Sequence, residues 1–132
     1  MPRPRSLDES ANTRGVAEAL FDAIERGDPL AAAACYADHA VIWRNTDGLE
    51  TTKAENVGVL EAFIRNVPSR RYDDRRLRVF PGGFVQQHVL RAVLANGTLC
   101  ELPACLVCRV DGGLITRLDE YFDAVQVEPF RG

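Results

Sequence analysis

The protein has 132 residues, of which 46% are hydrophobic and 27% are charged, and its formal net charge is −3. This length suits one domain with a sizeable core, and the composition excludes a disordered chain. No apolar run is long enough to span a membrane, and the acidic balance gives no field that attracts nucleic acid.

The first ten residues, MPRPRSLDES, lack the apolar stretch of a secretory signal. We therefore expect residues 1–10 to be a disordered leader and residues 11–132 to form a single domain. We expect the protein to be cytoplasmic and to bind neither membranes nor nucleic acid.

Two helices are predicted next. Val16, Leu20 and Ile24 recur at the spacing of one helix face. Asp28 followed by Pro29 is typical of an N-cap and the first turn of a second helix.

The sequence AVIW (40–43) predicts a short strand. Thr52 and Glu55 then have the spacing of a capping box, which predicts the start of a third helix. Pro68 ends that helix.

The second half has the pattern of strands. We interpret the charged stretch SRRYDDRRLR (69–78) as a solvated surface turn. Asn96-Gly97 and Asp111-Gly112-Gly113 are turn signals between apolar runs. Helices that precede an antiparallel meander indicate an α+β fold, with the helices on one face of the sheet.

Cys105 and Cys108 form a C-x-x-C motif within a predicted strand. Side chains three positions apart on a strand point to opposite faces. We therefore expect buried free thiols, with no disulfide and no bound metal.

Two segments carry a resemblance to a known family. CYADHAVIW (35–43) after two helices and DGGLITRLDEYFD (111–123) near the end resemble the nuclear transport factor 2-like superfamily. The SnoaL-like, ketosteroid-isomerase-like and limonene-epoxide-hydrolase-like branches are the most similar. The resemblance implies a cone-shaped, curved mixed or antiparallel sheet, wrapped with about three N-terminal helices around a deep apolar pocket. Members include isomerases, hydrolases, dehydratases, cyclases and proteins without catalytic activity.

Epoxide hydrolases of this type use an Asp-Arg-Asp arrangement with a Tyr and an Asn that help to hold a water. The resemblance places the last-strand Asp on Glu120. With a one-residue shift in the short strand, Asn45 and Trp43 match the Asn and the Tyr. Without that shift, Arg44 and Ile42 take these places.

The Arg-x-Asp of the central strand falls on Gln86 and His88 when VLRA (89–92) is aligned, and on Gln87 and Val89 when the hairpin is aligned without gaps. Both alignments lack the Arg and the Asp. The base of ketosteroid isomerases likewise has no carboxylate counterpart here.

His88 is a candidate general acid or base because imidazole titrates near neutral pH. Alternation puts Gln86, His88 and Leu90 on one face of their strand and Gln87 on the other. The VLRA alignment favours His88 as the inward residue. The alternative is a histidine on the outer face, bonded to a neighbour or at a dimer contact.

Glu120 interrupts the last predicted strand. Alternation places Glu120 with Leu118 and Phe122 on one face and Tyr121 on the other. Glu120 would then be the carboxylate of an apolar pocket. The alternative is an ion pair with a surface arginine such as Arg117.

The sequence thus predicts a small enzyme that acts on an apolar small molecule by general acid/base chemistry without metal or organic cofactor, as an isomerase, epoxide hydrolase, dehydratase or cyclase. The alternative is a non-catalytic ligand-binding or accessory protein. A homodimer through strands within 85–110 is expected, because the helices cover one sheet face. The expected catalytic residues are His88, Glu120 and Asn45, and the expected ligand-binding residues are Trp43, Gln86, Leu90 and Phe122.

Overall fold

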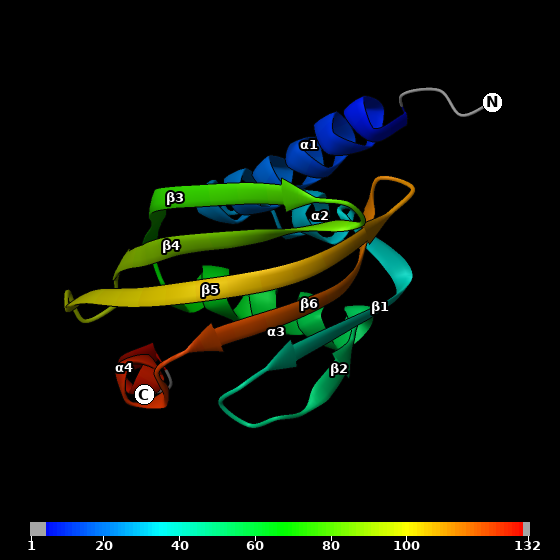
Figure 1. Ribbon diagram of the computed structural model, residues 1–132. Coiled ribbons are helices and arrows are strands. Elements are labelled where there is room, and N and C mark those ends of the chain that lie inside the picture. The colour runs from blue at the N-terminus through cyan, green and yellow to red at the C-terminus, as the bar shows by residue number, and fades with distance from the viewer. Residues whose placement is uncertain (1–4, 131–132) are drawn as a thin grey trace.

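The computed structural model describes residues 5–130, which fold into helices packed on a curved sheet (Figure 1). In chain order the elements are α1 (Arg5–Glu25), α2 (Pro29–Ala33), β1 (Tyr36–Arg44), β2 (Glu50–Thr52), α3 (Lys53–Asn66), β3 (Ser69–Phe80), β4 (Gly83–Val93), β5 (Leu99–Asp111), β6 (Leu114–Phe122), α4 (Ala124–Val127) and a 3₁₀ turn (Glu128–Phe130). None of these helices is long and apolar enough to cross a membrane.

The sheet has six strands in the order β2-β1-β6-β5-β4-β3. All neighbours are antiparallel except β1 and β6, which are parallel. The sheet is curved and unclosed, with α1, α2 and α3 on one face (Figure 1). We call this helix-covered side the concave face and the opposite side the convex face. The arrangement confirms the predicted α+β cone.

Both predicted helix starts are confirmed. The side chain of Asp28 accepts a hydrogen bond from the backbone N–H of Ala31 at 3.0 Å, which caps α2. At α3, Thr52 Oγ1 accepts from the N–H of Glu55 at 3.1 Å, and Glu55 Oε1 accepts from the N–H of Thr52 at 2.8 Å. These bonds satisfy N–H groups that have no partner within the helix.

The N-terminal elements differ in extent from the sequence-based expectation. α1 begins at Arg5, so residues 5–10, expected in a disordered leader, are helical, while residues 1–4 lie outside the described part. β1 begins at Tyr36 rather than at residue 40, because Tyr36 pairs with Ile115 of β6. The N–H of Ile115 also donates to the Cys35 carbonyl at 2.8 Å. The sheet partner therefore extends β1 beyond its local pattern.

Residues 69–78 form most of β3, so their interpretation as a surface turn was wrong. β3 pairs with β4 along its length and has a bulge between Asp73 and Arg76. Charged side chains join the strand to helix ends: Arg70 donates to the carbonyls of Ile24 and Val67, both at 2.7 Å. A charged edge strand also opposes pairing with another chain.

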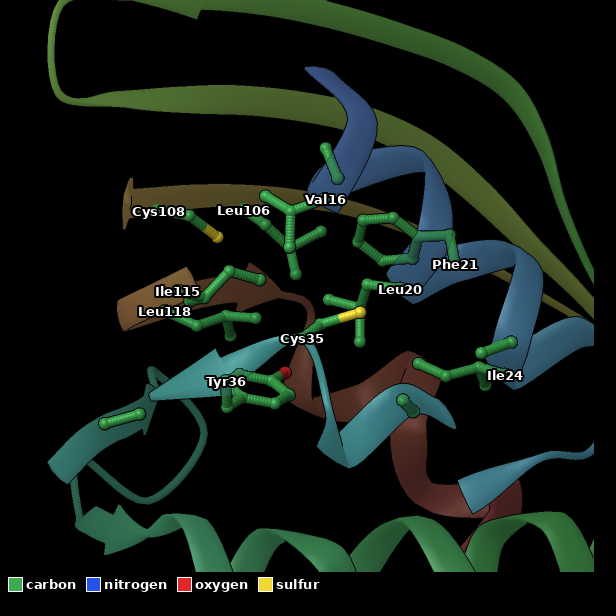
Figure 2. Close-up of a cluster of buried hydrophobic side chains, with 14 of the residues drawn as sticks. Val16, Leu20, Phe21, Ile24, Cys35, Tyr36, Leu106, Cys108, Ile115 and Leu118 are labelled. Atoms are coloured by element: carbon green, nitrogen blue, oxygen red, sulfur yellow. The ribbon is translucent and has the colours of Figure 1, made fainter. Parts of the chain in front are cut away.

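The core lies between α1 and the concave face (Figure 2). The helix supplies apolar residues at the predicted spacing, and the sheet supplies inward-facing residues of β1, β5 and β6. Burial of these side chains is the main favourable contribution to folding. The labelled members are Val16, Leu20, Phe21, Ile24, Cys35, Tyr36, Leu106, Cys108, Ile115 and Leu118.

On the convex face no helix of residues 5–130 packs over β4, β5 and β6 (Figure 1). Val107 and Tyr121 on this face are 37% and 44% exposed. The convex face is therefore the surface available for the predicted dimer.

Candidate functional site

A cavity of about 320 Å³ lies between the concave face of the sheet, α1, α3 and the C-terminal residues. Apolar side chains form most of its wall. Arg44, Asn56 and Glu120 add polar groups at one place in this wall. The apolar lining residues are Leu20, Phe21, Ile24, Val59, Leu60, Phe63, Leu90, Leu102, Leu106, Leu118, Phe122, Val127 and Phe130.

The polar group is a hydrogen-bonded chain of three side chains. Arg44 Nε donates to Glu120 Oε1 at 3.0 Å, and Arg44 Nη2 donates to Asn56 Oδ1 at 2.9 Å. The Arg44 and Glu120 side chains are 23% and 20% exposed, so the ion pair is shielded from bulk water. Water screens such a pair less than a surface pair.

The pairing of β1 with β6 brings Arg44 and Glu120 together. The two residues are directly opposite in the parallel ladder. Ile42 is buried in the core, and alternation turns Arg44 to the same face. The structure therefore places Ile42 and Arg44, rather than Trp43 and Asn45, on the inner face of β1. Asn56 lies one turn into α3 and is 1% exposed.

Two tyrosines also line this cavity. Tyr36 comes from the start of β1 and Tyr72 from β3. Burial is the largest cause that raises the pKa of each hydroxyl, and the charge of Glu120 raises both pKa values further. Both phenols are therefore protonated at neutral pH and can donate hydrogen bonds.

His88 points to the concave face, as the VLRA alignment predicted, but it is packed beneath α1. The residue is 4% exposed, and its Nδ1 lies 2.9 Å from Gln86 Nε2. Its ring centroid is 5.1 Å from that of Phe21 and 4.7 Å from that of Tyr72. Burial and the charge of Arg75 lower the pKa of His88 to about 4. At neutral pH it is a neutral core residue.

The structure does not bring His88 and Glu120 together. Glu120 is opposite Leu106 on β5, which is opposite Gln86 on β4. Two strand spacings, about 10 Å, therefore separate Glu120 from Gln86 along the sheet. His88 is a further two residues along β4. Glu120 bonds to Arg44 instead, and not to Arg117, the surface partner considered from the sequence.

The other predicted site residues divide into two groups. Leu90 and Phe122 line the cavity, as expected. Asn45 is exposed, and both ends of its amide are bonded to the Phe122 backbone: Nδ2 donates to the carbonyl and Oδ1 accepts from the N–H, each at 3.0 Å. Trp43 packs on Tyr121 of the convex side at 5.3 Å between ring centroids. The positions of Asn45 and Trp43 thus differ from the expected place at the pocket.

Sequence reasoning missed Arg44, Asn56, Tyr36 and Tyr72 as cavity residues. Arg44 was available as the unshifted match to the epoxide-hydrolase Asn. For Asn56 the signal was a polar residue four positions before the buried Leu60 on one helix face. Tyr72 had no usable signal, because its stretch was interpreted as a turn.

The C-x-x-C motif spans both faces of the sheet, as predicted. Cys108 belongs to the buried core, whereas Cys105 lines a wider hollow of about 770 Å³ on the convex side, together with Gln87, Val89 and Tyr121. All four cysteines are free. Within the described residues no cluster of three or more His, Cys, Asp or Glu could hold a metal ion.

Solved structures share this fold at low sequence identity. A candidate polyketide cyclase from Xanthomonas campestris aligns with a TM-score of 0.81 and 21% identity, over 93% of this chain and 98% of that one. An LEH-like epoxide hydrolase from M. tuberculosis gives 0.77 and 18%, over 92% and 90%. A hypothetical protein with a ketosteroid isomerase-like fold from Catenulispora acidiphila gives 0.76 and 15%, over 85% and 88%. These identities establish the fold and leave the reaction open.

Comparison with curated protein sequences gave no match. Residues 17–118 match the family of the SnoaL-like domain. This segment runs from α1 into β6 and includes most of the lining of the cavity. The chain therefore belongs to the SnoaL-like domain family.

Proposed function

We propose that the protein is a cofactor-independent enzyme for small apolar molecules, in which Glu120 transfers a proton to or from the ligand. The observation that carries this proposal is the charged Arg44–Glu120 pair in the wall of an otherwise apolar cavity. Charged side chains are rarely buried unless they are paired, and a charged pair in a cleft is a candidate functional site.

Each member of the pair has its own role in this proposal. The Glu120 carboxylate is the base, and Arg44 holds it in place through Nε. Asn56 fixes the guanidinium through Nη2. A guanidinium has five N–H donors, so Arg44 retains donors that can stabilise negative charge on a ligand oxygen. A base beside such donors suits proton removal next to a carbonyl, the step shared by isomerisation and aldol cyclisation.

The size of the cavity limits the substrate. Its volume of about 320 Å³ is near the lower end of the range of about 300–1,000 Å³ for ligand sites. A cavity of about 150 Å³ accommodates benzene. We therefore infer a substrate of one or two rings rather than a long polycyclic chain.

The names of related structures support small-molecule chemistry. The structures named polyketide cyclase and epoxide hydrolase share the fold over most of the chain. Proton removal next to a carbonyl is closer to the first name than to the second. Epoxide hydrolysis as the family performs it needs the Arg-x-Asp of the central strand, which is absent here.

The sequence-based roles are revised accordingly. Glu120 keeps the proposed role in proton transfer, and Leu90 and Phe122 keep their proposed contact with the apolar ligand. Arg44 and Asn56 replace His88 and Asn45 as its polar partners. We assign His88 to the support of α1 and Asn45 to the junction of β1 with β6.

The test is exchange of ligand protons for solvent deuterium, measured by NMR with a panel of one- and two-ring ketones. We expect exchange next to the carbonyl with the wild type, a large loss in Glu120→Gln and a smaller loss in Glu120→Asp. Glu101→Gln, on the convex side, is the matched control and should be unchanged. Ligand binding without exchange in every case would instead favour the non-catalytic binding protein.

A further inference from the structure

Tyr36 is a buried residue whose hydroxyl has no hydrogen-bond partner among residues 5–130. The residue is 4% exposed and lines the cavity. Every fully buried side-chain oxygen or nitrogen in this part of the chain has a hydrogen-bond partner, so the Tyr36 hydroxyl oxygen is not fully buried. The hydroxyl oxygen must therefore open onto the cavity, since buried polar groups without a partner are rare.

The position of Tyr36 is fixed from several sides. Its backbone pairs with Ile115 of β6, and its carbonyl accepts a hydrogen bond from Lys53 Nζ at 3.0 Å. Its ring belongs to the same buried core as Leu20 and Leu118 (Figure 2). A ligand would thus meet a hydroxyl that is already held in place, which reduces the entropy lost on binding.

The hydroxyl also lies within the electrostatic influence of the charged pair. Burial raises the pKa of Tyr36 most, Arg44 lowers this pKa, and Glu120 raises it. Tyr36, Arg44 and Glu120 all line this cavity. The phenol can contribute a neutral O–H donor beside the cationic donors of Arg44.

We infer that Tyr36 is a ligand-binding residue whose hydroxyl donates a hydrogen bond to an oxygen atom of the molecule in the cavity. This inference rests on the proposed function and specifies the ligand as a neutral carbonyl compound. A carboxylate suits the cavity less well, because Glu120 and Asp47 both line it and Arg44 already pairs with Glu120. A pure hydrocarbon would leave the hydroxyl without a partner.

The test uses two ligands of nearly the same shape, 2-acetylnaphthalene, which has a carbonyl, and 2-ethylnaphthalene, which does not. Their affinities are measured by calorimetry for the wild type, Tyr36→Phe and Tyr121→Phe. Tyr121 is the matched control because it is an exposed tyrosine on the convex side. The wild type and the control should prefer the ketone, and Tyr36→Phe should reduce this preference by about three- to tenfold, the range for one neutral hydrogen bond.

A second measurement does not depend on the variant. The carbonyl ¹³C resonance of bound 2-acetylnaphthalene should move downfield on binding to the wild type, because hydrogen bonding polarises the carbonyl. An unchanged affinity ratio in Tyr36→Phe would overturn the role of Tyr36 alone. A bound carbonyl resonance like that of the ketone in hydrocarbon solvent would overturn a hydrogen bond to the ligand oxygen from either Tyr36 or Arg44. Failure of both ligands to bind the wild type would overturn the proposed function and this inference with it.

Discussion

Two polar clusters lie on the concave face, and they have opposite surroundings. On β4, His88 packs against Phe21 and Tyr72 and is hydrogen-bonded to Gln86, and neither His88 nor Gln86 lines the cavity. Arg44 and Glu120 on β1 and β6 line the cavity. Both clusters point to the concave side of the sheet, so the direction of the side chains alone does not decide which cluster can contact a ligand.

The helices create the difference. α1 packs along β3 and β4 and its Phe21 covers His88, whereas residues of α1, α3, β6 and the C-terminal segment line the cavity. A covered polar cluster must satisfy itself, as the Gln86 and His88 side chains do. An uncovered cluster can retain free donors and acceptors for a ligand. The first cluster thus supports the fold, and the second is the candidate site.

Removal of the Glu120 charge should have the largest effect on turnover. Glu120→Gln should lower turnover of a ketone substrate by ~10²–10⁴-fold, the usual contribution of a general base. The kcat of His88→Ala should stay within about threefold of the wild-type kcat, under conditions in which the variant and the wild type are both fully folded. Steady-state kinetics measures both, and a His88 variant as inactive as the Glu120 variant would restore the dyad expected from the sequence.

Stability should respond in the opposite way. His88→Ala removes a ring from between two aromatic side chains and leaves Gln86 without its partner, so it should destabilise the protein by about 2–4 kcal/mol. Glu120→Gln keeps an oxygen that can accept from Arg44 Nε and removes only the charge, so it should destabilise the protein less, by about 1–2 kcal/mol. Urea unfolding measures the free energies of unfolding of the wild type, His88→Ala and Glu120→Gln. Equal losses would show that the two clusters do not differ in their contribution to the fold.

The pKa of His88 gives a prediction for acid. Burial and Arg75 lower the pKa from 6.5 to about 4 in the folded state, so the unfolded chain binds this proton first as the pH falls. The contribution of neutral His88 is therefore present above pH 6.5 and is lost as the pH falls towards 4. Between pH 7 and pH 5 the loss should be about 2 kcal/mol. Unfolding at both pH values should show a smaller loss for His88→Gln than for the wild type.

The uncovered convex face gives the smallest expected effect. We propose that a second copy covers the apolar part of β4 and β5, because exposed apolar patches of this kind commonly mark interfaces. Val89→Arg should then weaken dimerisation by about tenfold or more while the cavity is unaffected. Sedimentation equilibrium measures the dimer dissociation constant of the wild type and of Val89→Arg. A wild type that is monomeric at micromolar concentration would contradict the proposal.

The features predicted correctly from the sequence depend on local spacing. The two-residue period of strands puts Glu120 and Phe122 on one face of their strand and Leu90 and His88 on one face of theirs, and the family resemblance indicated that these faces turn inward. The caps at Asp28 and Thr52 follow from side chains near their own backbone. These relations need no knowledge of distant parts of the chain. The α+β cone came from the order of the elements and the family resemblance.

The features that were missed depend on long-range contacts. The inner face of β1 is set by its parallel pairing with β6, so Arg44 could not be chosen over Asn45 from the local pattern. The burial of His88 depends on where α1 crosses the sheet. Residues 69–78 form a strand because β4 offers a partner and helix ends bind their charges, although their composition is that of a turn.

The central claim is that a ligand binds in the cavity beside Arg44 and Glu120. NMR of the methyl-labelled protein with bound 2-acetylnaphthalene tests it most directly, through contacts between ligand protons and methyl groups. The account predicts contacts to Leu60, Leu118 and Val127, which line the cavity. Contacts to Val89 in the convex hollow, without contacts to these three residues, would contradict it.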